Sequence, residues 1–421
     1  MWYFSIKFID ESLMQMDEFN TIIKKELATG ANISIISLID HLIKHACDVN
    51  ASDIHIDPLS SSVRIRFRID GVLEDSHSLP SNIHGEIISR IKILSQLRTD
   101  EHYSAQDGRF RSIIPDGGSV DVRVSIVPTY YGENAVLRLL SSNRENFTLE
   151  TLGFGKAEHK KILQAIKKTS GMILVTGPTG SGKTTTLYTL IKMLNSNDIS
   201  IVTIEDPVEY AVDGIEQIQV NHRTGLTFAN GLRSILRQDP NVIMVGEIRD
   251  TETAAIAVNT ALTGHLLLTT LHTNDVGSTL PRLLDMKIEP FLVSSTVSIV
   301  IGQRLVRKIC ERCKEEKTLN DEEHSHLTEN ISDKVLKGNR RFFFGKGCEF
   351  CTKSGFKGRI VIHEVLVADE KIRAAILRKA SSGELKQIAI DGGMTTMLED
   401  GIKKAINGLT TIEEVIRVTH E

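Results

Sequence analysis

The hydrophobic pattern predicts a small α+β domain over residues 32–142, after an N-terminal segment over 1–31. Apolar positions have helical spacing from about residue 33, whereas residues 63–69 alternate strictly between apolar side chains and arginine and end in Asp70-Gly71. The expected elements are a helix from about residue 33, a strand over 63–69, a helix over 83–98, and strands over 120–127 and 135–140.

After a polar linker over 141–150, the pattern changes to α/β. A helix over 157–169 precedes short apolar runs, and the expected buried strands lie at 172–176, 199–204, 242–245 and 266–270. Buried strands that alternate with helices predict a doubly wound parallel sheet over residues 143–302. Residues 303–360 form an insertion with four cysteines, and residues 361–421 are predicted to be mostly helical.

Composition narrows the functional classes. The 421 residues include 50 Lys and Arg and 54 Asp and Glu, and a net charge of −4 excludes a globally basic nucleic-acid coat. Aromatic residues make up only 5%, so surfaces for base stacking would be scarce. The start lacks the pattern of a signal peptide, and the longest apolar stretch, 291–302, is too short to span a membrane. We therefore expect a cytoplasmic protein that contacts membranes only through partners.

The strongest chemical signal is a P-loop (Walker A motif). Residues 177–184, GPTGSGKT, fit GxxxxGK[ST], follow an apolar strand and open a helix. Glycines let backbone N–H groups turn inward, the helix N-terminus favours anions, and Lys183 reaches the β- and γ-phosphates while Thr184 binds Mg²⁺. The predicted nucleotide-binding residues are Gly177, Pro178, Thr179, Gly180, Ser181, Gly182, Lys183, Thr184 and Thr185.

Carboxylates follow two of the expected strands. Glu247 follows the strand over 242–245 after Gly246 and can polarise a water molecule there, although Gly246 stands where many P-loop ATPases carry an Asp. Glu205, Asp206 and Glu209 follow the strand over 199–204, at the edge of the sheet that faces ligands. Two interpretations of these three acids stay open: they support Mg²⁺ and the attacking water, or they form a charged turn shaped by Pro207.

Histidines and arginines are further candidates. His272 ends the strand over 266–270 and is placed to touch a γ-phosphate, whereas His265 at its other end is expected to be structural. Arg233 and Arg237 share one helical face, and Arg123 and Arg138 lie on neighbouring strands. Such cations stabilise the charge of a transferring phosphoryl group when another domain or subunit supplies them. We expect the alternating Arg64, Arg66 and Arg68 to form a solvated strand face.

Four of the five cysteines form two CxxC pairs, Cys310 with Cys313 and Cys348 with Cys351. Four thiolates suit a closed tetrahedral Zn²⁺ site with a structural role, and a redox role is the weaker alternative. Cys47 stands alone on the first helix and is predicted to be a small buried hydrophobe.

In this order, the motifs resemble those of the secretion ATPases that drive type II secretion and type IV pilus assembly. The resemblance covers residues 32–421, and its most specific stretches are GPTGSGKTTTLY (177–188), IEDPVEY (204–210), GLTFANGLRSILRQDPNVIMVGEIRD (225–250) and ALTGHLLLTTLHTND (261–275). It implies a RecA-like ATPase core preceded by a small PAS-like domain. The zinc subdomain is similar to that of secretion and pilus-extending members rather than of retraction ATPases.

The resemblance also implies roles and partners. Glu247 would activate water, Glu205 and Glu209 would support Mg²⁺ and water, and His272 would sense the γ-phosphate. The arginines at family positions near the nucleotide are Arg123, Arg138, Arg233, Arg237 and Arg359. Such ATPases form cytoplasmic homo-hexamers docked at the inner face of the inner membrane on a platform protein, and couple ATP hydrolysis to domain rotation and so to pilin or pseudopilin addition.

One departure from the family concerns the N-terminus. Long members carry an additional N-terminal docking domain, whereas only about 30 residues precede residue 32 here. Recruitment would then use another surface, or the chain is a short member, as competence pilus ATPases are. The sequence leaves open which of the secretion, pilus and DNA-uptake systems it serves.

Two rival functions stay open. A motor acting directly on nucleic acid would use the zinc subdomain and the basic run Arg304, Arg307, Lys308, Arg312 and Lys314. The net charge and the scarcity of aromatic residues argue against it, and we expect no direct nucleic-acid contact. A scaffold that binds nucleotide without turnover is the other rival, and the intact Lys183, Thr184 and Glu247 argue against it.

Overall fold

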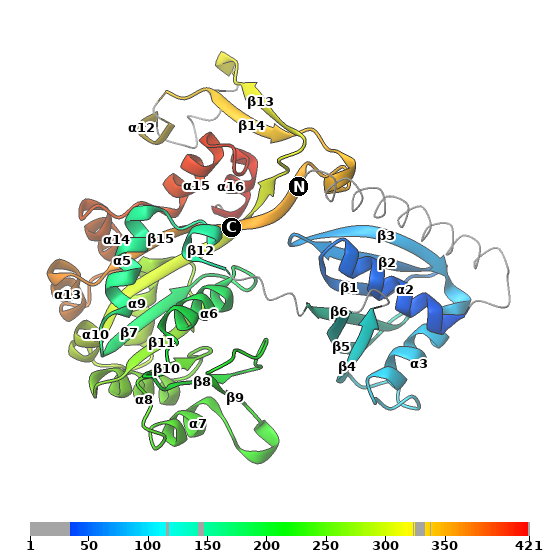
Figure 1. Cartoon of the computed structure of the whole chain (residues 1–421), viewed down its shortest axis with the longest axis horizontal. Coiled ribbons are helices and arrows are strands. Elements are labelled where there is room, and N and C mark those ends of the chain that lie inside the picture. The colour runs from blue at the N-terminus through cyan, green and yellow to red at the C-terminus, as the bar shows by residue number, and fades with distance from the viewer. Residues whose placement is uncertain are drawn as a thin grey trace. The chain divides into compact units, whose positions relative to one another are not determined.

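The computed structural model describes residues 34–114, 118–141, 147–322, 324, 333–336 and 338–419 (Figure 1). The chain divides into two compact units, Met1–Glu145 and Asn146–Glu421, and each is described by itself. The expected segment over 1–31 and residues 142–146 of the expected linker lie outside the described residues. Among the helices that are described, none has both the length and the apolar character needed to cross a membrane.

The first unit is an antiparallel sheet covered on one face by two helices (Figure 1). Its strand order is β3-β2-β1-β6-β5-β4. The elements are α2 Ile35–Asp48, β1 Ala51–Pro58, β2 Ser62–Ile69, β3 Val72–Pro80, η1 Ser81–Ile83, α3 His84–Leu94, β4 Gln106–Ile114, β5 Gly118–Thr129 and β6 Gly132–Ser141. The two helices and the three strands expected from the pattern are confirmed, whereas β1, β3 and β4 were not predicted.

Alternation along the strands divides this sheet into an apolar and a charged face. Ile65 and Phe67 of β2 pack beneath α2 and α3, and the arginines between the apolar residues point the other way. The arginines lie on the face away from the core, as expected, but they are also paired with carboxylates. Arg66 donates from Nε to Oδ2 of Asp57 at 2.7 Å, and Arg68 Nε lies 3.6 Å from Oδ2 of Asp53, because the unpredicted β1 lies beside β2.

The second unit is built on a mixed seven-stranded sheet with the order β15-β12-β7-β11-β10-β8-β9. Six neighbouring strands are parallel, as expected, and β15 pairs antiparallel with β12. The strands are β7 Gly171–Thr176, β8 Ile201–Glu205, β9 Glu216–Gln219, β10 Val242–Val245, β11 Leu266–Leu271, β12 Val297–Ile309 and β15 Phe356–Val367. The parallel sheet predicted over residues 143–302 is confirmed for the strands in that range, and the antiparallel edge strand β15 lies in a stretch where no strand was predicted.

Helices cover both faces of this sheet, as the doubly wound pattern requires. Met172 and Leu174 belong to the core under one layer, and Ile173 and Val175 to the core under the other. The first layer consists of α7 Phe228–Ile235, α8 Thr251–Leu262, α9 Val276–Asp285, α10 Pro290–Thr296, α13 Glu370–Leu377 and α14 Ser382–Asp391. The second consists of α4 Leu149–Leu152, α5 Lys156–Ile166 and α6 Lys183–Leu194.

The four-cysteine segment leaves the sheet from the end of β12 and rejoins it at the start of β15. Cys310 N donates to Gly355 O at 2.9 Å, which closes the base of this excursion. The excursion contains β13 Lys314–Thr318, α12 Asp333–Leu336, β14 Arg341–Gly345 and η3 Glu349–Cys351. A separate small core joins the excursion to α15 Met397–Ile406 and α16 Ile412–Thr419. Because β15 extends to Val367, the expected helical region begins after this strand rather than at residue 361.

Candidate nucleotide-binding site

The P-loop, residues 177–184, connects β7 to α6 in the place that the motif predicts. Gly177, Gly180 and Gly182 have φ values of 143°, 79° and 86°, a region that favours glycine. A side chain at Gly177 would place its Cβ 2.3 Å from the carbonyl oxygen of Gln303. The loop therefore depends on glycine both for its backbone conformation and for the close approach of β12.

Lys183 and Ser181 present groups suited to an anion. Nζ of Lys183 donates to the carbonyl oxygens of Gly177 at 2.8 Å and Pro178 at 3.0 Å, so the ammonium lies across the loop. Burial lowers the pKa of Lys183, and the nearby Glu247 opposes that shift. Oγ of Ser181 is buried without a hydrogen-bond partner among the described residues. A cation and an unused polar atom beside a helix N-terminus fit a phosphate chain.

Glu247 and His272 meet at the carboxyl edge of two neighbouring strands. Glu247 follows β10, His272 follows β11, and Nε2 of the histidine lies 2.7 Å from Oε2 of the glutamate. The other carboxylate oxygen contacts Arg249 at 2.5 Å. Although burial acts in the opposite direction, the hydrogen bonds from Arg249 and His272 lower the pKa of Glu247. The carboxylate is thus kept in its charged, proton-accepting form, and Arg249 is a contributor that the sequence analysis missed.

Glu205, the last residue of β8, occupies a different environment from the acids that follow the strand. Its side chain is buried, and it accepts hydrogen bonds from Tyr188 Oη at 2.5 Å, Thr203 Oγ1 at 2.6 Å and Gln217 Nε2 at 3.2 Å. Burial raises the pKa of this carboxyl group, against the effect of those hydrogen bonds. Glu209 is exposed nearby. Protein groups therefore already use both oxygens of Glu205, which favours a role in fixing α6 against β8.

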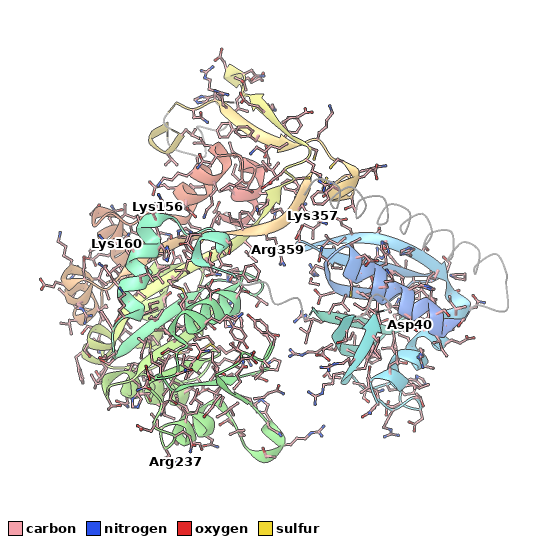
Figure 2. All side chains as sticks on the ribbon, viewed as in Figure 1. Asp40, Lys156, Lys160, Arg237, Lys357 and Arg359 are labelled. Atoms are coloured by element: carbon pink, nitrogen blue, oxygen red, sulfur yellow. The ribbon has the colours of Figure 1, made fainter. Side chains whose placement is uncertain are left out.

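The predicted arginines fall into three places. Arg233 lies on α7 and contacts Glu252 at 2.6 Å, and Arg237 follows α7 and donates to Arg233 O at 3.0 Å (Figure 2). Arg359 lies on β15 opposite Arg307 with an exposed side chain (Figure 2). Arg123 and Arg138 are cross-strand partners in β5 and β6 of the first unit, as expected. The structure thus brings together the P-loop, Glu205, Glu247 and His272.

Most of the basic run around β12 is engaged within the second unit. Arg304 is buried and donates to the carbonyl oxygen of Val418. Arg307 donates from Nη2 to Oε1 of Glu414 at 2.7 Å, and Lys314 donates to Gly408 O at 3.0 Å. The guanidinium of Arg312 stacks on the ring of Phe350, 3.8 Å from its centroid. These contacts anchor the ends of the excursion. They explain the basic residues by interactions within the protein, without a nucleic-acid partner.

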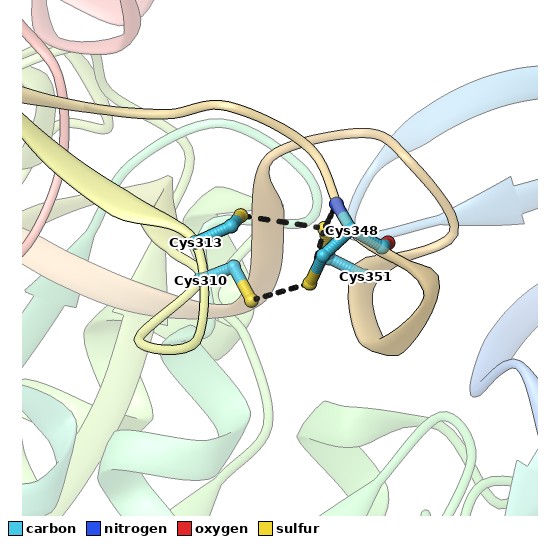
Figure 3. A group of neighbouring side chains, drawn as sticks. All are labelled: Cys310, Cys313, Cys348 and Cys351. Carbon is cyan, nitrogen blue, oxygen red and sulfur yellow. Dashed lines mark hydrogen bonds between the residues drawn. The ribbon is translucent and has the colours of Figure 1, made fainter.

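The four cysteines converge into one cluster (Figure 3). Sγ of Cys310 lies 3.8 Å from Sγ of Cys348, and the sulfurs of Cys313 and Cys351 and of Cys348 and Cys351 are 3.8 and 3.7 Å apart. Thiolates bound tetrahedrally at about 2.3 Å from Zn²⁺ are about 3.8 Å apart. Burial raises the pKa of Cys351, but hydrogen bonds from the backbone N–H groups of Cys348 and Gly355 outweigh this effect and lower the pKa to about 7. Cys47, in contrast, is half-buried against the core of the first unit.

Comparison with known proteins gives matches along almost the whole chain. The family described as type II/IV secretion system protein matches residues 29–417. Type II secretion system protein E of Xanthomonas campestris pv. campestris is 44% identical over 401 residues, which cover 94% of this chain and 69% of that protein. The type IV pilus assembly ATPase PilB of Thermus thermophilus is 46% identical over 384 residues, covering 91% of this chain but only 43% of that protein.

A solved structure supports the same relationship at the level of the fold. The crystal structure of the pilus retraction motor PilT with bound ADP has a TM-score of 0.60 and 28% sequence identity. The alignment covers 91% of this chain and 97% of that one. The α/β architecture described above is therefore the architecture of a motor ATPase that has been seen with a nucleotide.

Proposed function

The chain belongs to the type II/IV secretion system protein family and is an ATPase of it, and we propose that it hydrolyses ATP to drive assembly of a pilus or pseudopilus. One observation carries the proposal: the buried Lys183 of the P-loop and the Glu247–His272 pair lie at the carboxyl edge of the same sheet. The first supplies a cation for the phosphates, and the second supplies a base for the attacking water.

In the proposed site, residues 177–185 would hold the phosphates of ATP, and the hydroxyl of Thr184 would hold Mg²⁺. When bound, Mg²⁺ would neutralise negative charge on the phosphates. Thr184 lies exposed in the first turn of α6, where its hydroxyl is accessible to an ion. Glu247 accepts the proton of the attacking water, Glu209 supports that water and the ion, and His272 responds to the γ-phosphate. Glu205 acts from the interior by holding Tyr188 and β8 in place.

We propose further that the cysteine cluster holds one structural Zn²⁺. Zn²⁺ would tie η3 to the end of β12 and supply no catalysis, because four thiolates close its coordination shell. Backbone N–H groups of Gly347, Cys348 and Gly355 lie 3.2–3.3 Å from cysteine sulfurs, as suits thiolates that carry negative charge. The first unit is proposed to be PAS-like and residues 143–302 to be the RecA-like core, with the zinc subdomain over 303–360.

The family also supports proposals about assembly. We propose a cytoplasmic homo-hexamer recruited to the inner face of the inner membrane by a platform protein of a secretion or pilus machine. Arg233 lies on α7 and Arg237 in the turn that follows it. Both residues are exposed, so both are available to a neighbouring subunit. Arg123, Arg138 and Arg359 are proposed to complete the nucleotide site in the ring.

The experiment that tests this function measures ATP hydrolysis against protein concentration, with the particle mass measured in the same samples. Turnover that rises steeply as a hexamer-sized species appears supports a site completed by neighbouring subunits. Glu247→Gln serves as the control for contaminating ATPases. Hydrolysis by monomers at a specific rate independent of concentration would contradict the ring mechanism, and no hydrolysis in either form would favour the scaffold.

A further inference from the structure

Gln303 connects the middle of β12 to both ends of the P-loop. Its side chain is fully buried at 0% exposure, and β12 reaches it directly after pairing Gly302 with Thr176, the last residue of β7. Nε2 of Gln303 donates to the carbonyl oxygen of Ser181 at 2.8 Å. Oε1 accepts from the hydroxyl of Thr186 in α6, also at 2.8 Å. One amide therefore bridges the loop and the first turn of the helix.

The backbone of Gln303 constrains the same loop from its other end. A Cβ atom added at Gly177 would lie only 2.3 Å from the carbonyl oxygen of Gln303. A Cβ atom added at Gly182 would lie 3.3 Å from Nε2 of Gln303. Gln303 thus contacts the loop at three points: its first glycine, Ser181 and the start of α6. A phosphate-binding loop gains affinity when its N–H groups are ordered before the ligand arrives, because the ordering cost is then not subtracted from binding.

We propose that Gln303 is a positioning residue for nucleotide binding, whose amide holds the P-loop in the conformation that receives the phosphates. The inference rests on the proposed function, because it requires the loop to bind a nucleotide. An amide suits this position chemically. It supplies one donor and one acceptor without charge, whereas a carboxylate would lack the donor for Ser181 O and would add a negative charge beside the phosphates.

Two variants of the full chain separate positioning from packing. Gln303→Met keeps the side-chain volume and removes both hydrogen bonds, so we expect ATP and ADP to bind about tenfold more weakly or worse, with KM raised more than kcat is lowered. Gln303→Glu keeps the acceptor for Thr186 but loses the donor when ionised. A buried carboxyl group has a raised pKa, and its protonated form again donates to Ser181 O. Relative to the wild type at each pH, affinity in Gln303→Glu should therefore recover as the pH falls from 8 to 6.

Glu414→Gln provides the matched control. Glu414 lies on α16, and its buried side chain binds Arg417 of the same helix and Arg307, which is four residues further along β12 than Gln303. Its replacement should lower thermal stability and leave nucleotide affinity unchanged. The inference is overturned if Gln303→Met binds nucleotide like the wild type. It is equally overturned if Glu414→Gln weakens binding as much, or if Gln303→Glu shows no recovery with pH. If the wild type itself binds no nucleotide, the proposed function fails and this inference with it.

Discussion

Nε2 of His272 lies 2.7 Å from Oε2 of Glu247, which places the groups that follow β11 and β10 in direct contact. Because Arg249 contacts the other oxygen at 2.5 Å, the carboxylate is held between two donors. A glutamate in this position must give up part of one contact before it accepts a proton from water. Movement of His272 toward a γ-phosphate would therefore change the basicity of Glu247, which couples the sensing of the phosphate to the activation of the water.

Replacement of Lys183 by Ala should abolish nucleotide binding. The ammonium is the cation that lies across the P-loop, and its loss leaves the phosphate charge without a partner. Titration with ATP measures the effect, and Lys192→Ala, on the last turn of the same helix, is the matched control. Full affinity for ATP in Lys183→Ala would refute the P-loop assignment.

Replacement of Glu247 by Gln should leave ATP binding intact and lower kcat by about 100-fold or more, because the general base is lost. Single-turnover kinetics with saturating ATP separate hydrolysis from binding. Near-normal turnover would move the base to Glu209, since both oxygens of Glu205 accept hydrogen bonds from protein groups.

The acid limb of the pH–rate profile should report the donors around Glu247. Its pKa lies below the ordinary value because hydrogen bonds from Arg249 and His272 outweigh burial. In Arg249→Ala one of these donors is lost while burial remains, so the pKa rises and activity fails at a higher pH than in the wild type. The kcat/KM profile from pH 4 to 8 measures this shift. An unchanged acid limb in Arg249→Ala would show that Glu247 is not the titrating base, and Arg340→Ala, an exposed residue near β14, is the control.

Freshly purified protein should contain about one zinc per chain, and Cys310→Ser should lose it. The four sulfurs are held at separations suited to one tetrahedral ion, and a hydroxyl is a weaker ligand than a thiolate for Zn²⁺. Elemental analysis of both proteins measures the content. Cys47→Ser, which removes a cysteine of the other unit, should retain the metal. Wild-type protein without zinc would contradict the prediction.

Glu414 should make the second unit sensitive to acid. Although burial opposes the shift, hydrogen bonds from Arg417 and Arg307 lower its pKa to about 2 from 4.5. A depressed pKa contributes stability that is present above about pH 4.5 and is lost as the pH falls toward 2, by about 3 kcal/mol in total. The difference in unfolding free energy between wild type and Glu414→Gln, measured in urea, should therefore shrink from pH 7 to pH 3. The exposed neighbour Glu413→Gln should show no such trend, and a constant difference for Glu414→Gln would contradict the assignment.

Local patterns were sufficient for the P-loop and the central strands. Four of the sheet's strands are short apolar runs, and the loop between β7 and α6 has a motif whose spacing follows from phosphate geometry. In contrast, β1 was missed because Asp53 and Asp57 interrupt its apolar pattern. Their burial is compensated by arginines from β2 and β6, which only the sheet brings alongside.

The partners of the site residues could not be predicted from the sequence either, because only the folded sheet brings them alongside. Gln303 contacts Thr186 across 117 positions, and it lies in a stretch that the pattern assigned to the boundary of an insertion. Tyr188, which bonds to Glu205, resembles any other apolar position of an amphipathic helix. Motif spacing can thus identify the groups that act on a ligand, whereas the groups that hold them depend on strand order and register.

The closed base of the cysteine excursion holds the ends of β12 and β15 together. Cys310 and Gly355 are joined by a backbone hydrogen bond, and β12 and β15 are paired from Ile299–Val367 to Ile309–Phe356. The free energy of closing such a loop changes by only about 0.6 kcal/mol for each doubling of its length. Changes of length between β13 and α12 should therefore cost the fold little free energy, whereas replacement of the whole excursion would remove Leu336 and Phe342 from the core shared with α15 and α16.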